Sequence, residues 1–161
     1  MIRLKQMIIV MFLLINTQIV IASSAVYTAS VKGDFEVIYK NIHTALEKNR
    51  LFVVFEPDIG SNIANFEKRW GKDYNRNKLD RIKSMVFCNA WYANQVSNLD
   101  VSMTAMCPLH ITLTYKDKIT SVHFVRPDYI AKGSNAASVA HELTQRVIKS
   151  IKEGISASKN K

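Results

Sequence analysis

The sequence predicts an α+β fold with a mixed, largely antiparallel sheet and helices packed on one face. A hairpin pattern over residues 110–125 indicates two antiparallel strands, and short apolar runs at residues 26–31, 51–55 and 82–88 indicate three more. Segments with helical spacing separate these runs, which favours helices collected on one side of the sheet. The chain has 161 residues, a length that favours a single domain.

The first half of the chain alternates between strand and helix patterns. Residues 26–31 alternate weakly between apolar and polar side chains, and Asp34 is the expected N-cap of the helix that follows. The apolar positions of this helix recur at helical spacing: Phe35, Ile38, Ile42, Ala45 and Leu46. The strand at residues 51–55 ends before Pro57. In residues 58–83 the pattern predicts only a short amphipathic helix and a polar loop.

The hairpin has the clearest pattern. If Asp117 and Lys118 form a two-residue turn, the register pairs Tyr115 with Thr120, Leu113 with Val122, and Ile111 with Phe124. These six side chains share one face, which we expect to be buried because five of them are strongly apolar. The opposite face then carries polar side chains: His110, Thr112, Thr114, Ser121 and His123.

Two helices complete the predicted domain. Residues 89–99 favour a short helix between the strand at residues 82–88 and the hairpin. After a loop that follows Pro127, the last helix begins beyond residues 133–135. Its expected buried stripe consists of Ala136, Ala140, Leu143, Val147 and Ile151.

The first 25 residues have the composition of a secretory signal peptide. Arg3 and Lys5 precede an apolar run, which ends in small residues and offers cleavage after Ala22 or Ala25. The run is shorter than a bilayer-spanning helix requires, so export is favoured over a retained anchor. We therefore expect a periplasmic or secreted protein with a signal peptide at residues 1–25, one domain at residues 26–155 and a polar tail at residues 156–161.

The chain is strongly basic, with a formal net charge of +9 at pH 7. Outside the cytoplasm such a charge favours contact with an anionic envelope surface and not with nucleic acid. Basic residues interleave with Trp70 and Tyr74 in residues 68–83, a pattern also found in proteins that bind single-stranded nucleic acid. Because export is expected, we interpret this segment as a solvated loop face.

Cys88 and Cys107 are the only cysteines of the chain. In an exported protein they are candidates for a disulfide bond. If their two strands ran parallel as neighbours, the cysteines would lie at opposite ends of the sheet, too far apart to bond. A disulfide therefore requires antiparallel strands, or a connection that returns to the end of the sheet at which Cys88 lies. The sequence leaves both arrangements open. The spacing excludes a Cys-x-x-Cys redox motif.

The candidate metal ligands are His110, His123, Cys107 and Met106. In the predicted register the two histidines are diagonal neighbours on the polar face of the hairpin. Imidazole, thiolate and thioether groups suit copper or zinc. The alternative is that the histidines are solvated and that the methionines fill gaps in the core. We expect no cofactor, with copper or zinc as the alternative.

The ordered set of these segments resembles the domain of unknown function 302 family over residues 27–155. The resemblance rests on the sequence Val86-Phe87-Cys88-Asn89-Ala90, on Met106-Cys107-Pro108 before the hairpin, and on Arg126-Pro127 before the last helix. It implies a compact α/β domain that forms homodimers, and it implies no established activity. The chain departs from the family in two places. Asn49-Arg50 stands where a glycine is expected, and the hairpin turn lacks one.

The sequence contains no nucleophile elbow, no phosphate-binding glycine loop and no paired carboxylates. Our leading hypothesis is therefore an exported, non-catalytic binding or accessory module. The alternative is a periplasmic metal-handling or thiol redox protein that uses Cys88, Cys107, His110 and His123.

Overall fold

The computed structural model describes residues 24–159, so most of the expected signal peptide lies outside the described residues. The strands are β1 (Val26–Lys32), β2 (Phe52–Phe55), β3 (Arg81–Cys88), β4 (Leu109–Lys116) and β5 (Ile119–Val125). The helices are α2 (Phe35–Lys48), α3 (Ile59–Ala64), α4 (Glu67–Trp70), α5 (Ala90–Leu99), α6 (Pro127–Ile130) and α7 (Ala137–Lys159). Two 3₁₀ helices, η1 (Gly71–Asp73) and η2 (Val101–Met106), lie in connecting segments.

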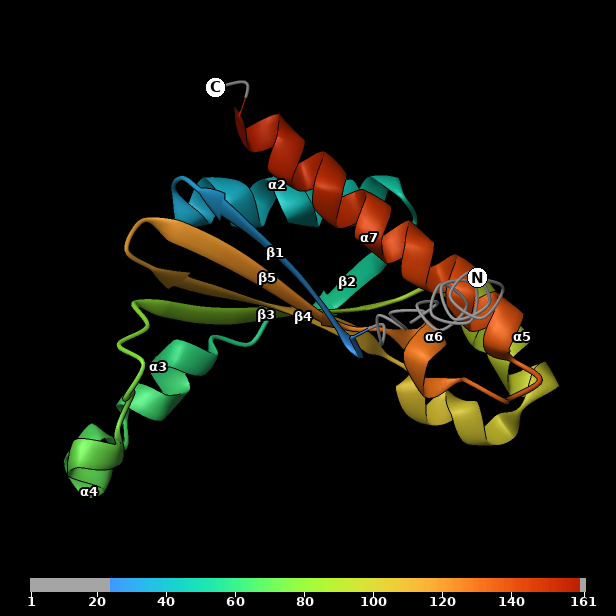
Figure 1. The fold of residues 1–161 in the computed structure, drawn as a ribbon, viewed down its shortest axis with the longest axis horizontal. Helices are drawn as coiled ribbons and strands as arrows, with labels where there is room; N and C mark the ends of the chain where they lie inside the picture. Colours follow the sequence, from blue (N-terminus) through green and yellow to red (C-terminus); the bar gives the residue numbers. More distant parts are fainter. Residues whose placement is uncertain (1–23, 160–161) are drawn as a thin grey trace, which may run out of the picture.

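The five strands form one sheet in the order β1-β5-β4-β3-β2 (Figure 1). Every pairing in this sheet is antiparallel. The predicted α+β class is confirmed, and the sheet, expected to be mixed but largely antiparallel, is antiparallel throughout. The hairpin β4–β5 lies at its centre, with β1 and β2 at the two edges.

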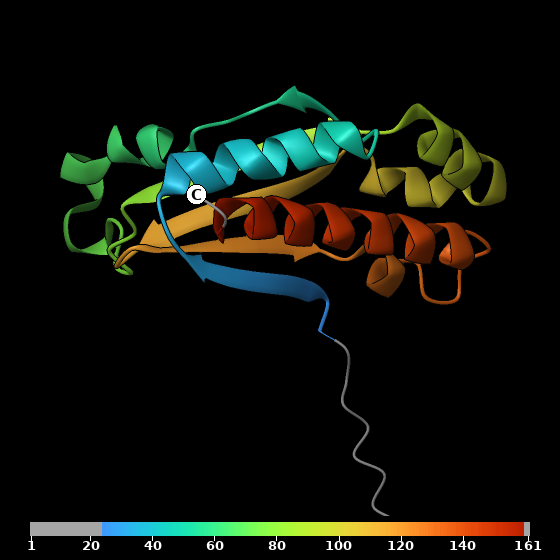
Figure 2. The same cartoon turned by 90° about the horizontal axis from the view of Figure 1, so that it is seen from above.

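The long helices α2 and α7 lie side by side on one face of the sheet (Figure 2). Asp34 caps α2 as predicted, because its carboxylate accepts a hydrogen bond of 2.9 Å from the backbone N–H of Val37. The two helices approach closely at Gly154 of α7, whose Cα faces Ile42 of α2. All five residues of the predicted stripe are buried; four of them lie on α7, and Ala136 immediately precedes it.

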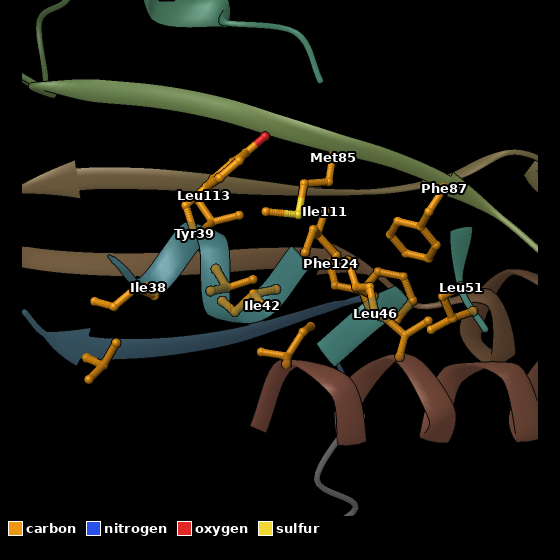
Figure 3. Packing of buried hydrophobic residues seen from close by; sticks show 14 of the residues in the cluster. Ile38, Tyr39, Ile42, Leu46, Leu51, Met85, Phe87, Ile111, Leu113 and Phe124 are labelled. Carbon is orange, nitrogen blue, oxygen red and sulfur yellow. The ribbon is translucent and has the colours of Figure 1, made fainter. Parts of the chain in front are cut away.

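The core fills the space between the sheet and these two helices (Figure 3). Ile42 and Leu46 of α2 meet side chains of β3, β4 and β5, including Met85, Ile111 and Phe124. The hydroxyl of Tyr39 donates a hydrogen bond of 3.1 Å to the backbone carbonyl of Ser84, and burial raises the pKa of this phenol. Burial of these apolar side chains is the main favourable term in the stability of the domain.

The hairpin has the predicted register: Tyr115 pairs with Thr120, and Leu113 pairs with Val122. Asp117 and Lys118 both have positive φ, 52° and 62°, as a two-residue type I′ turn requires. Positive φ also occurs at Arg50, where φ is 60°. Both sites at which the family resemblance favours glycine therefore have the backbone conformation that glycine prefers.

Three segments differ from the sequence-based expectations. Residues 58–73 contain two short helices and a 3₁₀ turn in place of one helix, and residues 127–130 form the helix α6 where a loop was expected. The helix α7 continues through Lys159, so residues 156–159 of the expected polar tail are helical. In the part of the chain that the structure describes, no helix combines the length and apolarity needed to cross a membrane.

Candidate functional site

One face of the sheet is turned away from α2 and α7, and we call it the open face. The short helices α3 and α4 project beyond one end of this face, and α5 and α6 project beyond the other end (Figure 1). Because side chains alternate along a strand, the residues of the open face follow from the buried ones. They are Val26, Thr28, Ser30, Lys32, Phe52, Phe55, Ile82, Ser84, Val86, Cys88, His110, Thr112, Thr114, Lys116, Ile119, Ser121, His123 and Val125.

The open face has an unusual composition for an exposed sheet surface. It includes no aspartate, glutamate or arginine, and its two lysines, Lys32 and Lys116, lie at the end near the hairpin turn. Apolar side chains along it are well exposed: Phe52 by 52%, Phe55 by 62% and Val125 by 44%. An uncharged surface that exposes large apolar side chains is typical of an interaction site.

Hydroxyl and imidazole groups bond to one another across the centre of the open face. The Nδ1 and Nε2 atoms of His123 lie 3.3 Å from the Thr28 Oγ1 atom and 3.2 Å from the Thr114 Oγ1 atom. The Oγ atom of Ser84 lies 2.6 Å from the Oγ1 atom of Thr112. The partners of His123 are thus threonines, and neither is a carboxylate that would orient it as a general base.

The predicted metal ligands are only partly brought together. His110 and His123 lie on the same face of the hairpin, since His123 pairs with Thr112 and His110 is two residues away on that strand. Met106 ends the 3₁₀ helix η2, next to Cys107. Among residues 24–159 there is no group of three or more His, Cys, Asp or Glu side chains that could hold a metal ion. Copper or zinc at these residues stays a prediction without geometric support.

The two cysteines lie at the same end of the sheet. Strands β3 and β4 are antiparallel, and Phe87 pairs with Leu109, which brings Cys88 alongside residues 107 and 108. Both cysteines are unbonded and half-buried. Burial and the nearby Cys88 raise the pKa of the Cys107 thiol. The antiparallel arrangement, which the sequence had left open, removes the geometric objection to a disulfide bond.

A groove of about 720 Å³ lies between α2 and α7 on the side away from the sheet. Lysines from both helices line it, namely Lys48, Lys149 and Lys152. The carboxylate of Glu153 also lines the groove, but it accepts a hydrogen bond of 2.8 Å from the Asn49 amide and lies 3.8 Å from the Lys149 ammonium. The groove therefore has an excess of positive charge.

An ionic cluster that the sequence pattern did not predict lies at the start of α6. Arg126 donates two hydrogen bonds to the carboxylate of Asp128, at 3.0 and 2.8 Å, and His141 of α7 lies 3.4 Å from the same carboxylate. Burial alone would raise the pKa of Asp128, but the hydrogen bonds and charges of Arg126 and His141 lower it overall. The sequence Arg126-Pro127-Asp128 was the available signal, because proline and an acidic residue favour the first turn of a helix.

Arg126 also binds the start of the described chain. Its backbone N–H donates a hydrogen bond of 2.9 Å to the carbonyl of Ala25, and its guanidinium donates one of 3.3 Å to the carbonyl of Ser24. Residues 24 and 25 thus belong structurally to the folded domain, although both precede β1.

The basic segment around Trp70 lies on α4 and η1, at the end of the molecule (Figure 1). Trp70 stacks on Phe66 at 5.0 Å between ring centroids, and each of the two side chains is 42% exposed. One face of the indole is therefore engaged within the protein.

The comparisons with known proteins agree with this fold. The family model described as "Domain of unknown function DUF302" matches residues 27–154. The chain belongs to the DUF302 family. It is also similar to the crystal structure of an uncharacterized conserved DUF302 protein from Bacillus stearothermophilus, with 13% sequence identity and a TM-score of 0.69. That similarity covers 81% of this chain and 98% of the other, and it shows the fold alone. No curated protein matches the chain.

Proposed function

We propose that this DUF302 protein is an exported, non-catalytic binding or accessory module that acts through its open face. The observation that carries the proposal is the absence of charge over most of this face, combined with the exposure of Phe52, Phe55 and Val125. Its polar groups are largely bonded to one another, so a partner can cover them without leaving them unsatisfied.

The proposed partner is a second copy of the chain. Two strongly basic molecules repel each other unless they meet at surfaces without charge, and the open face is such a surface. A sheet of five strands with about seven residues each offers an area of roughly 500 Å² per copy, near the lower limit for a specific interface. The short helices project at only two ends of the face (Figure 1), so two sheets crossed at roughly 90° would avoid each other's projections.

Oligomeric state tests this proposal with a matched pair of variants. Val125 on the open face and Val37 on α2 are exposed to similar extents, 44% and 40%. In sedimentation equilibrium the wild type and Val37→Lys should be dimeric, whereas Val125→Lys should be monomeric because two new ammonium groups would be buried at the interface. Circular dichroism should show that both variants remain folded. A monomeric wild type at 100 μM, or a dimer that Val125→Lys leaves intact, would refute the open-face dimer.

The lysines of the helix groove support a second contact, with an anionic envelope surface. Lys48 and Lys152 have no carboxylate within ion-pair distance among the described residues. They would face the surface while the open face holds the partner copy. Co-sedimentation with vesicles of anionic lipid should decrease on replacing both lysines by glutamine, and should decrease with added salt. Glutamine at Lys32 and Lys116, on the other face of the molecule, is the control and should have a smaller effect.

A further inference from the structure

Cys88 and Cys107 occupy a single apolar pocket. Both cysteines line it, together with Leu51, Tyr92 and Leu143. The two thiols are close enough for Cys88 to act electrostatically on Cys107. The pocket joins the end of the sheet to α5 and α7.

The strand register brings these two residues to the same end of the sheet. Each residue of β3 pairs with a residue of β4 in an unbroken antiparallel run from Arg81 with Tyr115 to Phe87 with Leu109. One further step brings Cys88 opposite Pro108, and Cys107 is the next residue. The chain between the cysteines forms α5 and η2, a helical segment that leaves the sheet at Cys88 and returns to it at Cys107.

We infer that Cys88 and Cys107 form a reversible intramolecular disulfide by exchange with a low-molecular-weight disulfide such as oxidised glutathione. The thiolate of one cysteine attacks one sulfur of the oxidised glutathione, releases one glutathione thiolate and forms a mixed disulfide. The thiolate of the other cysteine then attacks the protein sulfur of the mixed disulfide and releases the second glutathione. Two protein thiols are oxidised, one glutathione disulfide is reduced, and the two protons pass to the glutathione thiolates.

Burial and the neighbouring Cys88 raise the pKa of the Cys107 thiol, which reduces the fraction of thiolate at Cys107 near neutral pH. The bond would close a loop of about 20 residues and hold α5 and η2 against the sheet. This inference rests on no property of the open-face dimer, so either proposal can fail without the other.

Mass spectrometry of the purified protein after exposure to oxidised glutathione tests the inference. The wild type should lose two hydrogens and retain no glutathione, and excess reduced glutathione should reverse the change. Cys107→Ser should accumulate one glutathione on Cys88, because the resolving thiol is absent. Cys88→Ser should accumulate one glutathione on Cys107 for the same reason. A wild type that keeps two glutathione adducts, that forms a disulfide between copies, or that retains both free thiols overturns the proposal.

Thermal unfolding supplies a second readout. The oxidised wild type should melt at a higher temperature than the reduced wild type, because the crosslink restricts the unfolded chain. The double variant Cys88→Ser, Cys107→Ser should melt at the same temperature with and without oxidant. An identical melting temperature for the two redox forms of the wild type would contradict a bridge that ties α5 and η2 to the sheet.

Discussion

Gly154 lies so close to Ile42 that a Cβ atom at residue 154 would stand 2.6 Å from the Cα atom of Ile42. The neighbour is backbone, which cannot rotate away as a flexible side chain can. This one position therefore sets the separation of α7 from α2, and with it the packing of both helices on the sheet. A larger residue can be accommodated only if the helices move apart.

We expect Gly154→Ala to lower the free energy of unfolding by about 1–3 kcal/mol, despite the higher helix propensity of alanine. Ser156→Ala, at an exposed position of the same helix, should leave it unchanged within about 0.5 kcal/mol. Urea unfolding followed by circular dichroism measures both values. A Gly154→Ala protein as stable as the wild type would show that the helices do not pack at the distance described.

Two of the non-glycine residues with a left-handed backbone conformation should respond in the opposite direction when replaced by glycine. Arg50 and Lys118 have φ values of 60° and 62°, where a side chain is strained. Replacing either by glycine should raise the free energy of unfolding by about 0.5–1 kcal/mol, because the relief of strain exceeds the added chain entropy. Lys116→Gly, in a regular strand two residues before Lys118, is the control and should be destabilising. Urea midpoints of Arg50→Gly and Lys118→Gly below that of the wild type would contradict the turn geometry.

Acid unfolding should depend on Asp128. Arg126 and His141 lower the pKa of this carboxyl despite its burial, so its ionised form stabilises the folded state. That contribution is complete above the pKa of an unfolded aspartate, about 3.9, and is lost as the pH falls through the lower pKa of the folded state. The stability difference between wild type and Asp128→Asn should therefore shrink as the pH falls below about 4. A difference that does not change with acid would mean that the ionic cluster does not stabilise the fold.

The contacts of Arg126 favour one of the two cleavage sites. Cleavage after Ala25 would remove the carbonyls of Ser24 and Ala25, which accept hydrogen bonds from Arg126. Cleavage after Ala22 keeps both, so we expect the mature protein to begin at Ser23. Intact mass of the exported protein identifies the first residue. Independently, a chain that begins at Ser23 should be more stable in urea than one that begins at Val26, by about 1 kcal/mol.

Local pattern was sufficient to predict much of the fold. The hairpin register followed from two rows of side chains that only one turn position could explain, and the core stripes of α2 and α7 followed from helical spacing. The short helices α3, α4 and α6 were harder to predict, because four to six residues are too few to show a helical period. The Asp128 cluster was also missed, since His141 joins it only through the packing of α7.

By itself the sequence determined the fold class, the type of the main elements and the faces that each of them buries, because these depend on the spacing of residues near one another in the chain. The tertiary structure alone decided the strand order and direction, which brought Cys88 and Cys107 to one end of the sheet. It also assembled the open face, whose side chains come from all five strands. The physical reason is that a period of two shows which side chains share a face of a strand but does not identify the strand's neighbour. That choice depends on how the whole core packs.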